Sequence, residues 1–455
     1  MADETMSVDD LDLPEKARRF FAEQWGIERL HPPQKQSIEP IFTGKSALIA
    51  IPTASGKSLI AYMGILRKLL LEEVGSKAVY IVPLKALATE KYEELTQLGK
   101  ALNLTIGLGI GDATSEAKKI NQCDILVCTS EKLDSLIRNR SETMSNVSII
   151  VADEFHLLND ASRGPTLEIN LTKLRYLKPN AQIIALSATV GNCNELAKWL
   201  DAELIISDWR PVALEYSTYH DLHLEPRLVQ SSARSSEPGN LKPPRDLVGP
   251  KSHPTWVALE DTLDSQGQLL IFVGTRKSAE SEALKLSKRV QKKLSKENPE
   301  KLDLFSNVVA SIEGGRQSAM ADKLIECLKG GTAFHHAGLT HNQRKIIEQA
   351  FKSGIISCLT ATPTLAAGVN LPARRVLVRD IKRWDDGMSR PLPVMEIRQM
   401  LGRAGRPKYD DFGEAWVLCK GTDGWEVADM VSEKYFFGEV EPIISKLSGE
   451  PALRT

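Results

Sequence analysis

A run of small and polar residues between two apolar segments carries the clearest chemical signal in this sequence. It follows the apolar segment Ser46–Ile51 and precedes the helical pattern LIAYMGILRKLL. A strand, a Gly-Lys-Ser turn and a helix in that order form a loop whose backbone N–H groups point at phosphate oxygens, and the helix N-terminus adds a favourable dipole. The sequence therefore predicts a phosphate-binding loop made of Ile51, Pro52, Thr53, Ala54, Ser55, Gly56, Lys57 and Ser58.

Two side chains of this loop have defined chemical tasks. Lys57 would supply a point charge to the β- and γ-phosphates of a nucleotide, and the Ser58 hydroxyl would be a ligand of Mg²⁺. The common pattern of such loops begins with glycine, where this chain has Ile51. A chance Gly-Lys-Ser turn is the alternative, and only a second element of the same site can exclude it.

The second element follows the apolar segment Val147–Ala152, which ends in Asp153-Glu154-Phe155-His156. A carboxylate at the tip of a strand can hold Mg²⁺, because this ion prefers oxygen ligands. We therefore predict Asp153 as a metal ligand together with Ser58, and Glu154 as the group that orients and polarises the attacking water. An acidic turn after a strand is common by itself, but both elements in this order predict a nucleotide site.

The composition sets the limits within which this site must work. The chain has 455 residues, 42% of them hydrophobic and 26% charged, and a formal net charge of −1. These values are typical of a globular protein of two or three domains, and they do not argue against nucleic-acid binding, which depends on the local field along a groove. No apolar run approaches the roughly 20 residues that cross a bilayer, and the acidic N-terminus lacks the order of a secretory signal. We expect a cytoplasmic protein that does not bind a membrane.

Short apolar runs that alternate with helical patterns position the candidate residues. In the first half, the predicted strands are Ser46–Ile51, Ala78–Val82, Ile125–Cys128, Val147–Ala152 and Ile183–Ser187. Such alternation is typical of a parallel sheet with crossover helices, and ligands of open α/β sheets bind beyond the carboxyl ends of the strands. Because the candidate residues directly follow these runs, we expect them to share one edge of the sheet.

A second α/β series follows the first. Its predicted strands are Gln268–Val273, Gly331–Ala333, Ile356–Thr360, Arg375–Val378 and Ala415–Leu418. Between the two series, the stretch from about Leu228 to Pro254 is rich in Ser, Pro and Gly, which predicts a linker or an inserted loop. We interpret the basic segment Lys277–Lys301 as the solvated face of a helix rather than as a dedicated nucleic-acid site. The two halves thus look like one architecture used twice.

The motifs of both halves together resemble one family, the superfamily-two helicases with a DExH box. The resemblance implies an α/β fold of two tandem RecA-like domains, with parallel sheets flanked by helices and an inter-motif β-hairpin in the second. In the first half, Gln34 resembles the family's adenine-contacting Q motif. The family's coupling motifs between nucleotide and nucleic acid correspond to His156, Ser187 and Thr189. Its strand-contacting motifs correspond to Pro83, Lys85, Gly111, Asp112, Thr129 and Ser130.

The second half carries the remaining motifs of the family. Gln399-Met-Leu-Gly402-Arg403-Ala-Gly-Arg406 matches motif VI without a break. The resemblance implies that Arg403 and Arg406 are catalytic, Arg406 as the arginine finger, and that Gly368 and Gln399 bind the nucleotide. The motifs implied to contact nucleic acid contain Thr275, Arg276, His336, Thr360 and Thr362.

Within the superfamily, the chain is similar to the Ski-type branch and to its archaeal Hjm-type DNA repair helicases. PTASGKS, HHAGL, GVNLPAR and QMLGRAGRP carry this likeness. The segment VRDIKRWDDGMSRPLPVMEIRQM resembles a β-hairpin with which that family parts duplex strands, and Asp385-Asp386-Gly387 is a turn signal between two extended runs. We expect Arg383 and Trp384 on this hairpin to contact nucleic acid; an ordinary surface hairpin is the alternative.

These patterns divide the chain into five predicted segments. They are an N-terminal segment (1–30), an ATP-binding RecA-like domain (31–210), a linker or inserted loop (211–255), a second RecA-like domain (256–425) and a C-terminal tail (426–455). Members of the family carry a winged-helix domain and a helical ratchet domain after the second motor domain. About thirty residues follow Lys420 here, too few for a winged helix. The tail would be the start of a missing winged-helix region, and the chain a motor core without those domains.

The motifs predict a nucleic-acid-stimulated ATPase that uses ATP and Mg²⁺. The resemblance implies 3′–5′ movement on single-stranded DNA and unwinding of duplex or branched DNA in repair or at stalled forks, by a monomer that is nucleoid-associated if archaeal. DNA is favoured over RNA, although an RNA helicase of the same branch and a translocase that does not unwind are alternatives. A nucleic-acid-binding scaffold with a silent ATPase is the alternative from another class. The intact Lys57, Asp153, Glu154 and Arg406 argue against it.

Overall fold

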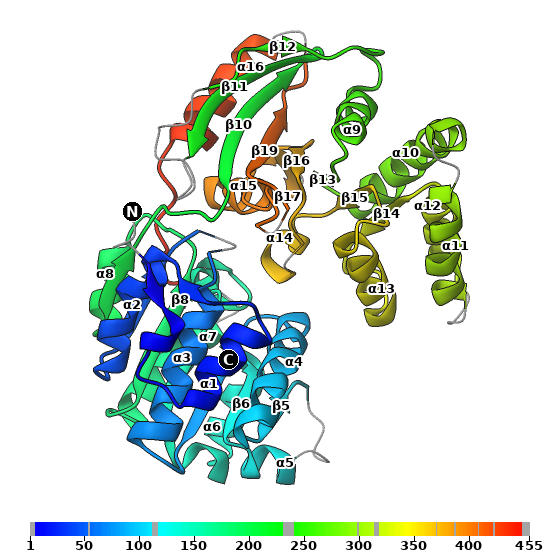
Figure 1. Cartoon of the computed structure of the whole chain (residues 1–455). Helices are drawn as coiled ribbons and strands as arrows, with labels where there is room; N and C mark the ends of the chain where they lie inside the picture. The colour runs from blue at the N-terminus through cyan, green and yellow to red at the C-terminus, as the bar shows by residue number, and fades with distance from the viewer. Residues whose placement is uncertain are drawn as a thin grey trace. The chain divides into compact units, whose positions relative to one another are not determined.

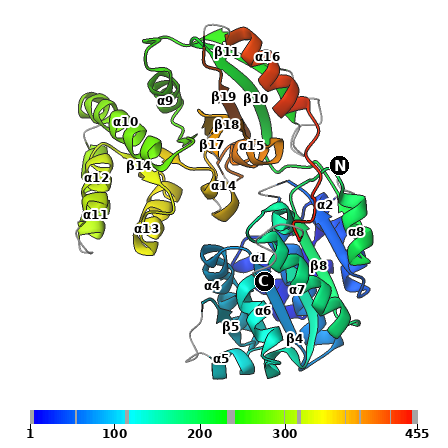
Figure 2. The same cartoon turned by 180° about the vertical axis from the view of Figure 1, so that it is seen from behind.

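The computed structural model describes two compact units of this chain (Figures 1 and 2). Unit 1 consists of Met1–Trp209 and Val440–Thr455, and unit 2 of Arg210–Glu439. The described residues are 5–52, 55–111, 117–230, 241–297, 300–313, 318–369, 371–385, 388–407, 409–421 and 424–447. The prediction of two tandem α/β domains is confirmed, because each unit has its own largely parallel sheet.

Unit 1 is built on a seven-stranded sheet in which all neighbouring strands are parallel. In the order β5-β6-β4-β7-β8-β3-β9, the strands are β5 (Ile106–Gly109), β6 (Ile125–Thr129), β4 (Lys77–Val82), β7 (Val147–Ala152), β8 (Gln182–Ser187), β3 (Ala47–Ala50) and β9 (Glu203–Ile206). Every residue of β3, β6, β7 and β8 is buried, as a parallel sheet covered on both faces requires. The sequence analysis missed only the two edge strands, β5 and β9. Both are short and partly exposed, and β5 alternates apolar residues with glycine.

Helices connect and cover the strands of unit 1. They are α1 (Glu15–Glu23), α2 (Pro32–Phe42), α3 (Lys57–Arg67), α4 (Lys85–Leu102), α5 (Ala117–Gln122), α6 (Ser130–Arg138), α7 (Gly164–Leu177) and α8 (Cys193–Leu200). The N-terminal segment is part of this unit, because β1 (Met6–Ser7) pairs with β2 (Arg29–Leu30) and Phe21 is fully buried in its core.

The last described residues also belong to unit 1. Asn192 bonds Ile443 through both ends of its amide, since its Nδ2 donates to the Ile443 carbonyl at 3.0 Å and its Oδ1 accepts from the Ile443 N–H at 2.8 Å. Ser445 donates to the Glu168 carboxylate at 2.9 Å. The chain therefore passes from one unit to the other twice, after Trp209 and after Glu439.

Unit 2 contains an eight-stranded sheet of mixed direction. In the order β12-β11-β10-β19-β16-β13-β15-β14, the strands are β12 (Arg245–Asp246), β11 (His223–Gln230), β10 (Ala213–His220), β19 (Phe412–Leu418), β16 (Arg375–Val378), β13 (Leu269–Phe272), β15 (Cys358–Ala361) and β14 (Thr332–His335). The first three are antiparallel to one another, and the strands from β10 to β14 are parallel.

The prediction of a linker over residues 211–255 is wrong for 213–230, which form β10 and β11. These strands could not be predicted from the sequence, because β10 has no continuous apolar run. Its polar residues Glu215, Ser217 and Thr218 are buried together with their apolar neighbours. The second unit consequently begins at Arg210 rather than near residue 256.

Helices of unit 2 flank this sheet. They are α9 (Pro254–Asp264), α10 (Arg276–Glu297), α11 (Glu300–Glu313), α12 (Ala319–Leu328), α13 (His341–Lys352), α14 (Thr364–Gly368), α15 (Val394–Leu401) and α16 (Gly424–Val431), which continues as a π-helical turn over Ser432–Phe437. The helices α10, α11 and α12 gather beside the edge strand β14 (Figure 1). The predicted β-hairpin is confirmed as β17 (Lys382–Asp385) and β18 (Met388–Pro391), an antiparallel pair. Among the described residues, no helix has the length and apolar character to span a bilayer.

Candidate active site

Three neighbouring parallel strands of unit 1 bring the nucleotide motifs together. β7, β8 and β3 lie side by side, and each ends where a motif begins. Asp153 follows β7, Ala188 follows β8 and Ile51 follows β3. Since parallel strands end at the same edge of their sheet, residues far apart in the sequence meet there.

The described part of the predicted phosphate loop contains a left-handed glycine and the lysine. Gly56 has φ = +79° and is the N-cap of α3, a left-handed conformation that other residues adopt only with strain. A Cβ at this position would also lie 2.3 Å from Gln34 Nε2. Lys57 Nζ donates to the carbonyls of Ile51 (2.9 Å) and Ser187 (3.1 Å), so the ammonium lies between the loop and the end of β8. Thr53 and Ala54 lie outside the described residues.

Gln34 connects this loop to the start of α2. Its Oε1 accepts from the His31 N–H at 2.8 Å, and its Nε2 donates to the carbonyls of Ser55 (3.4 Å) and Gly56 (3.3 Å). Both ends of the buried amide therefore bond to the chain itself. The structure gives Gln34 a supporting contact with the phosphate loop, beside the adenine contact that the sequence suggested.

Tyr80 joins the two predicted Mg²⁺ ligands. The Tyr80 hydroxyl interacts with the Ser58 side chain and donates to Asp153 Oδ2 at 2.8 Å. The other carboxylate oxygen, Oδ1, accepts from the Glu154 N–H at 2.9 Å. Burial, followed by the charge of Glu154, raises the pKa of Asp153, whereas Lys91, Tyr80 and Lys57 act in the opposite direction. Sequence reasoning missed Tyr80, because only its hydroxyl distinguishes it within the apolar run of β4.

His156 connects the acidic motif to the residues after β8. Its Nδ1 accepts from the Ala188 N–H at 3.3 Å, and its Nε2 lies 3.5 Å from Glu154 Oε2. Burial, assisted by the charge of Lys57, lowers the pKa of His156 to about 3, so the ring is neutral at pH 7. Ser187 is fully buried and Thr189 is half-buried beside this contact. The predicted coupling residues thus form a physical link between Glu154 and the segment Ser187–Thr189.

The other half of the same sheet edge holds the predicted strand-contacting residues. Pro83 and Lys85 follow β4, Gly111 follows β5, and Thr129 and Ser130 lie at the end of β6. Lys85 is exposed and Gly111 has φ = +73°, whereas the other three are buried. Thr129 caps α6 by accepting from the Lys132 N–H, and Asp112 lies outside the described residues. The edge is therefore divided into two parts. The predicted nucleotide motifs follow β7, β8 and β3, and the motifs predicted to contact nucleic acid follow β5, β6 and β4.

In unit 2, the predicted nucleic-acid residues differ in exposure. Thr275 and Arg276 are exposed at the start of α10, where Thr275 Oγ1 accepts from the Ser278 N–H. Thr362 is buried. His336 and Thr360 are buried: His336 lies 3.4 Å from Glu280, and Thr360 donates to the Ala279 carbonyl at 2.8 Å. His336 and Thr360 are thus buried and contact residues near the start of α10, whereas Thr275 and Arg276 are exposed there. The two buried residues support this part of unit 2 and are not exposed for direct contact.

Arg406 of motif VI is held by two residues that the sequence analysis did not single out. Its Nε and Nη2 donate to the carboxylate of Asp410 at 2.9 Å each, and its Nη1 donates to Gln268 Oε1 at 3.0 Å. Asp410 and Gln268 are both buried, and Gln268 Nε2 is fixed by the carbonyls of Phe351 and Ile356. Gln268 immediately precedes β13, so the guanidinium lies at the amino edge of this sheet, opposite the edge that Thr275 and Arg276 follow.

The other motif VI residues lie in the interior of the same unit. Arg403 is buried and donates to the carbonyl of Ala366 in α14, which ends at Gly368. Gln399 is half-buried on α15. Motif VI therefore contacts α14 directly, and Gly368 lies two residues beyond that contact in the sequence.

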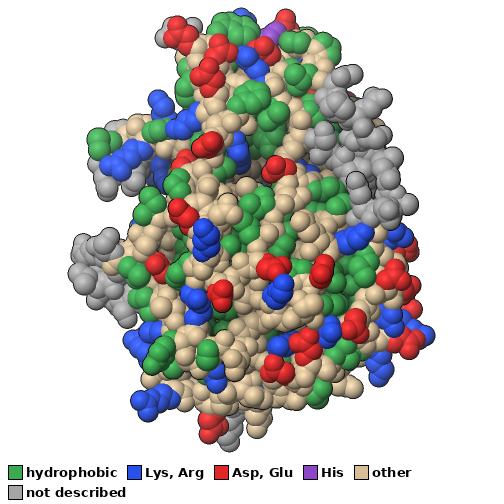
Figure 3. All heavy atoms as spheres, turned by 90° about the vertical axis from the view of Figure 1, so that its left-hand side faces the viewer, with side chains coloured by type: hydrophobic (Ala, Val, Ile, Leu, Met, Phe, Trp, Pro, Cys, Tyr) green, Lys and Arg blue, Asp and Glu red, His purple; other side chains and the backbone are tan. Residues whose placement is uncertain are grey.

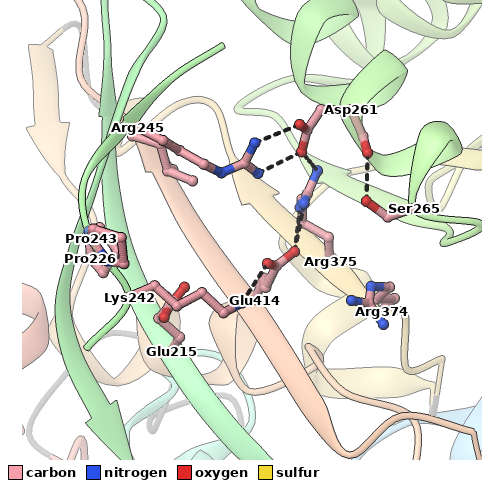
Figure 4. A pocket seen from close by; sticks show the side chains of 11 residues that line it. Glu215, Pro226, Lys242, Pro243, Arg245, Asp261, Ser265, Arg374, Arg375 and Glu414 are labelled. Carbon is pink, nitrogen blue, oxygen red and sulfur yellow. Dashed lines mark hydrogen bonds and ion pairs between the residues drawn. The ribbon is translucent and has the colours of Figure 1, made fainter. Parts of the chain in front are cut away.

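A charged pocket of about 310 Å³ lies beside motif VI (Figure 4). Arg375 is fully buried, stacks on Trp416 and donates to both Glu414 and Asp261. Arg374 also lines the pocket, and its Nη1 is 3.9 Å from Asp410, the residue that holds Arg406. Asp410 thus lies between Arg406 and a residue of this pocket, Arg374.

The hairpin is anchored at one of its predicted contact residues. Arg383 Nη1 lies 3.2 Å from Glu396 Oε2 at the start of α15. The side chain of Trp384 lies outside the described residues. Leu392 N–H donates to the Ile381 carbonyl at 2.8 Å and closes the base of the hairpin.

Comparisons with known proteins agree with this architecture. The DEAD/DEAH box helicase model matches residues 31–196, and the helicase conserved C-terminal domain model matches residues 285–408. The ATP-dependent DNA helicase Hel308 of Methanocella arvoryzae is 42% identical over 455 residues, and that of Pyrococcus horikoshii is 41% identical over 452. Each match covers 99% of this chain but 58% of the relative, so the chain spans little more than half of their length. The motifs, the two RecA-like units and these matches together show that the chain belongs to the superfamily-two helicases of the Hel308 type.

Proposed function

We propose that this chain is the motor core of an ATP-dependent DNA helicase that moves 3′–5′ along single-stranded DNA and unwinds duplex or branched DNA. It would act as a monomer on nucleoid DNA, in repair or at stalled forks. The observation that carries the proposal is the position of the Tyr80 hydroxyl, which interacts with Ser58 and donates to Asp153, together with Lys57 at the end of the neighbouring strand β8. The relatives are named as ATP-dependent DNA helicases, which supports the choice of DNA.

The residues of this chain fit a nucleotide with Mg²⁺. Gly56, in a left-handed conformation, is the N-cap of α3, whose first backbone N–H groups would bind phosphate oxygens. Lys57 would supply a positive charge to the same oxygens. Ser58 and Asp153 share the Tyr80 hydroxyl, which keeps the two oxygen ligands close to each other. When bound, Mg²⁺ would neutralise charge that develops on the phosphates. Glu154 would orient the attacking water.

Hydrolysis in this proposal requires a group from the second unit. Arg406 would stabilise the charge of the transferring phosphoryl group, which is worth about 10³–10⁵ in rate, or roughly 4–7 kcal/mol. Because Lys57 and Arg406 belong to different units, ATP would draw the units together and product release would let them relax. His156 would transmit the state of Glu154 to Ser187–Thr189.

The strand would bind through its phosphates. Lys85 and Gly111 in unit 1, and Thr275 and Arg276 in unit 2, follow carboxyl ends of parallel strands. A cationic side chain, a hydroxyl and backbone N–H groups suit phosphate oxygens and do not read sequence. We therefore expect sequence-independent binding with strong salt dependence.

A phosphate-release assay tests the proposal. ATP hydrolysis should rise on addition of single-stranded DNA, and the same protein should separate a 3′-tailed DNA duplex in preference to a 5′-tailed one. Hydrolysis that no strand stimulates would favour a scaffold with a silent ATPase. Stimulation without strand separation would indicate a translocase, and a preference for tailed RNA duplexes would indicate an RNA helicase.

A further inference from the structure

Helix α10 carries a row of exposed lysines. Residues 284–296 (LKLSKRVQKKLSK) include six basic residues and no acidic one. The exposed members spaced three or four positions apart are Lys285, Lys288, Lys292 and Lys296, which we call the lysine face. Residues at this spacing lie on one side of a helix, and the buried Leu286, Val290 and Leu294 lie on the other.

Few carboxylates compensate this face. The acidic residues of α10 point elsewhere: Glu280 pairs with Lys323, Glu282 with Arg379 and Glu297 with Lys293. Lys288 has one distant partner, Glu326 at 3.9 Å. Among the residues that the structure describes, no ion pair involves Lys285, Lys292 or Lys296.

This distribution differs from an ordinary solvated surface. On the face shown in Figure 3, basic and acidic side chains are interspersed. Like charges three or four positions apart on a helix repel each other by a few tenths of a kcal/mol per pair. A row of one sign is therefore slightly unfavourable until a polyanion lies against it.

The position of α10 relates this face to the proposed strand path. The helix begins at Arg276, directly after the exposed Thr275, and packs beside the edge strand β14 (Figure 1). At 1.5 Å per residue, the distance from Arg276 to Lys296 is about 30 Å, and the lysine face itself is about 17 Å long. The face therefore extends away from Thr275 and Arg276 along one continuous helix.

We propose that the lysine face binds the sugar-phosphate backbone of duplex DNA next to the single strand that the motor holds. α10 contains no aromatic residue on which an unpaired base could stack, so the contact is made to phosphates. Duplex DNA carries one negative charge per about 1.7 Å of axis, which is enough for each of the four lysines to meet a phosphate along 17 Å. The proposal rests on the proposed helicase function and specifies where the duplex part of the substrate lies.

The test compares three variants of the full chain. The first replaces the four lysines of the lysine face by Gln, and the second replaces them by Arg. The matched control removes four exposed lysines from four other helices, Lys16, Lys100, Lys198 and Lys352. Fluorescence anisotropy at several KCl concentrations gives the affinity for a 3′-tailed duplex and for a bare single strand of equal length.

Each lost phosphate contact reduces the steepness of the plot of log affinity against log salt concentration by about 0.9. For the Gln variant, this slope should therefore be about 3 to 4 smaller on the tailed duplex and nearly unchanged on the single strand. The Arg variant and the control should keep both slopes. An unchanged slope on the tailed duplex, an equal loss on the single strand or an equal effect in the control would each overturn the proposal. Strand-stimulated ATP hydrolysis of the Gln variant shows that it is folded. If the unsubstituted chain lacked that stimulation, the helicase function itself would fail instead.

Discussion

At the scale of single residues, the site depends on buried polar groups that hold the motif residues in place. Gln34 fixes the phosphate loop, Tyr80 joins Ser58 to Asp153, and Asp410 holds Arg406. A buried polar group that loses its partner costs about 1–3 kcal/mol. Substitutions at these supporting positions should therefore be detectable in nucleotide chemistry.

Tyr80→Phe removes the hydroxyl that both predicted Mg²⁺ ligands contact. The concentration of Mg²⁺ that supports half-maximal ATP hydrolysis should rise about tenfold, the equivalent of ~1.4 kcal/mol for one hydrogen bond to a charged group. Affinity for single-stranded DNA should not change. Tyr62→Phe is a matched control, because this buried hydroxyl bonds Glu94 instead. An Mg²⁺ titration of Tyr80→Phe that coincides with that of the unsubstituted chain would show that the hydroxyl does not position the ligands.

Asp410→Asn weakens the contact that orients Arg406. The turnover number should fall about tenfold while the KM for ATP stays within about threefold, because the finger acts in the transition state and not in ground-state binding. Steady-state ATPase kinetics with saturating single-stranded DNA measure both constants. Asp411→Asn, at the exposed neighbouring position, should leave them unchanged. A faster turnover in Asp410→Asn would mean that Asp410 withholds the guanidinium instead of positioning it.

The motifs predicted some of these residues and not others, for a physical reason. Lys57 and Asp153 could be recognised because their chemistry requires a fixed local backbone, a loop before a helix or the tip of a strand. Tyr80, Gln268 and Asp410 are common residue types, and only the tertiary structure brings them to the site. Thr360 and His336 lie in matching motifs, yet the structure uses their polar atoms inside unit 2.

At the scale of elements, the strand order of unit 1 separates two tasks. The chain order of the motifs was predictable, but the order of the strands in the sheet was not. β4 and β7 are neighbours at the centre of the sheet. The predicted nucleotide motifs follow β7 and the strands beyond it, β8 and β3, whereas the motifs predicted to contact nucleic acid follow β4 and the strands beyond it, β6 and β5. Strand β10, whose buried residues are partly polar, could not be predicted from the hydrophobic pattern. Its Glu215 pairs in register with Glu414 of β19, and no apolar run signals a strand there.

The hairpin β17–β18 can be replaced by a short link, with the loss of the ion pair between Arg383 and Glu396 of α15. The hydrogen bond between Leu392 and Ile381 closes its base, so a Gly-Gly link can replace Lys382–Pro391. Separation of a 3′-tailed duplex should then be lost, whereas single-stranded DNA should still stimulate ATP hydrolysis to within about twofold, because the nucleotide motifs are untouched. Gel-based unwinding and phosphate release on the same preparation measure the two activities. Unwinding that survives the deletion would reduce the hairpin to a surface feature.

At the scale of the whole molecule, two connections join the units. The segment after Glu439 returns to unit 1 and bonds Asn192, three residues beyond Thr189 of the coupling motif. The predicted C-terminal tail, residues 426–455, is divided between the units: residues 426–439 belong to unit 2, and the described residues 440–447 pack on unit 1. Motion of one unit relative to the other would therefore act on both of these connections.

The central claim is that hydrolysis needs Lys57 from unit 1 and Arg406 from unit 2. Arg406→Ala tests it most directly, with ATP affinity measured by equilibrium binding and hydrolysis measured in a single turnover with single-stranded DNA. The account predicts an affinity within about threefold of the unsubstituted chain and a rate lower by about 10³ or more. Hydrolysis at an undiminished rate would contradict it, since unit 1 would then hydrolyse ATP without the guanidinium of unit 2.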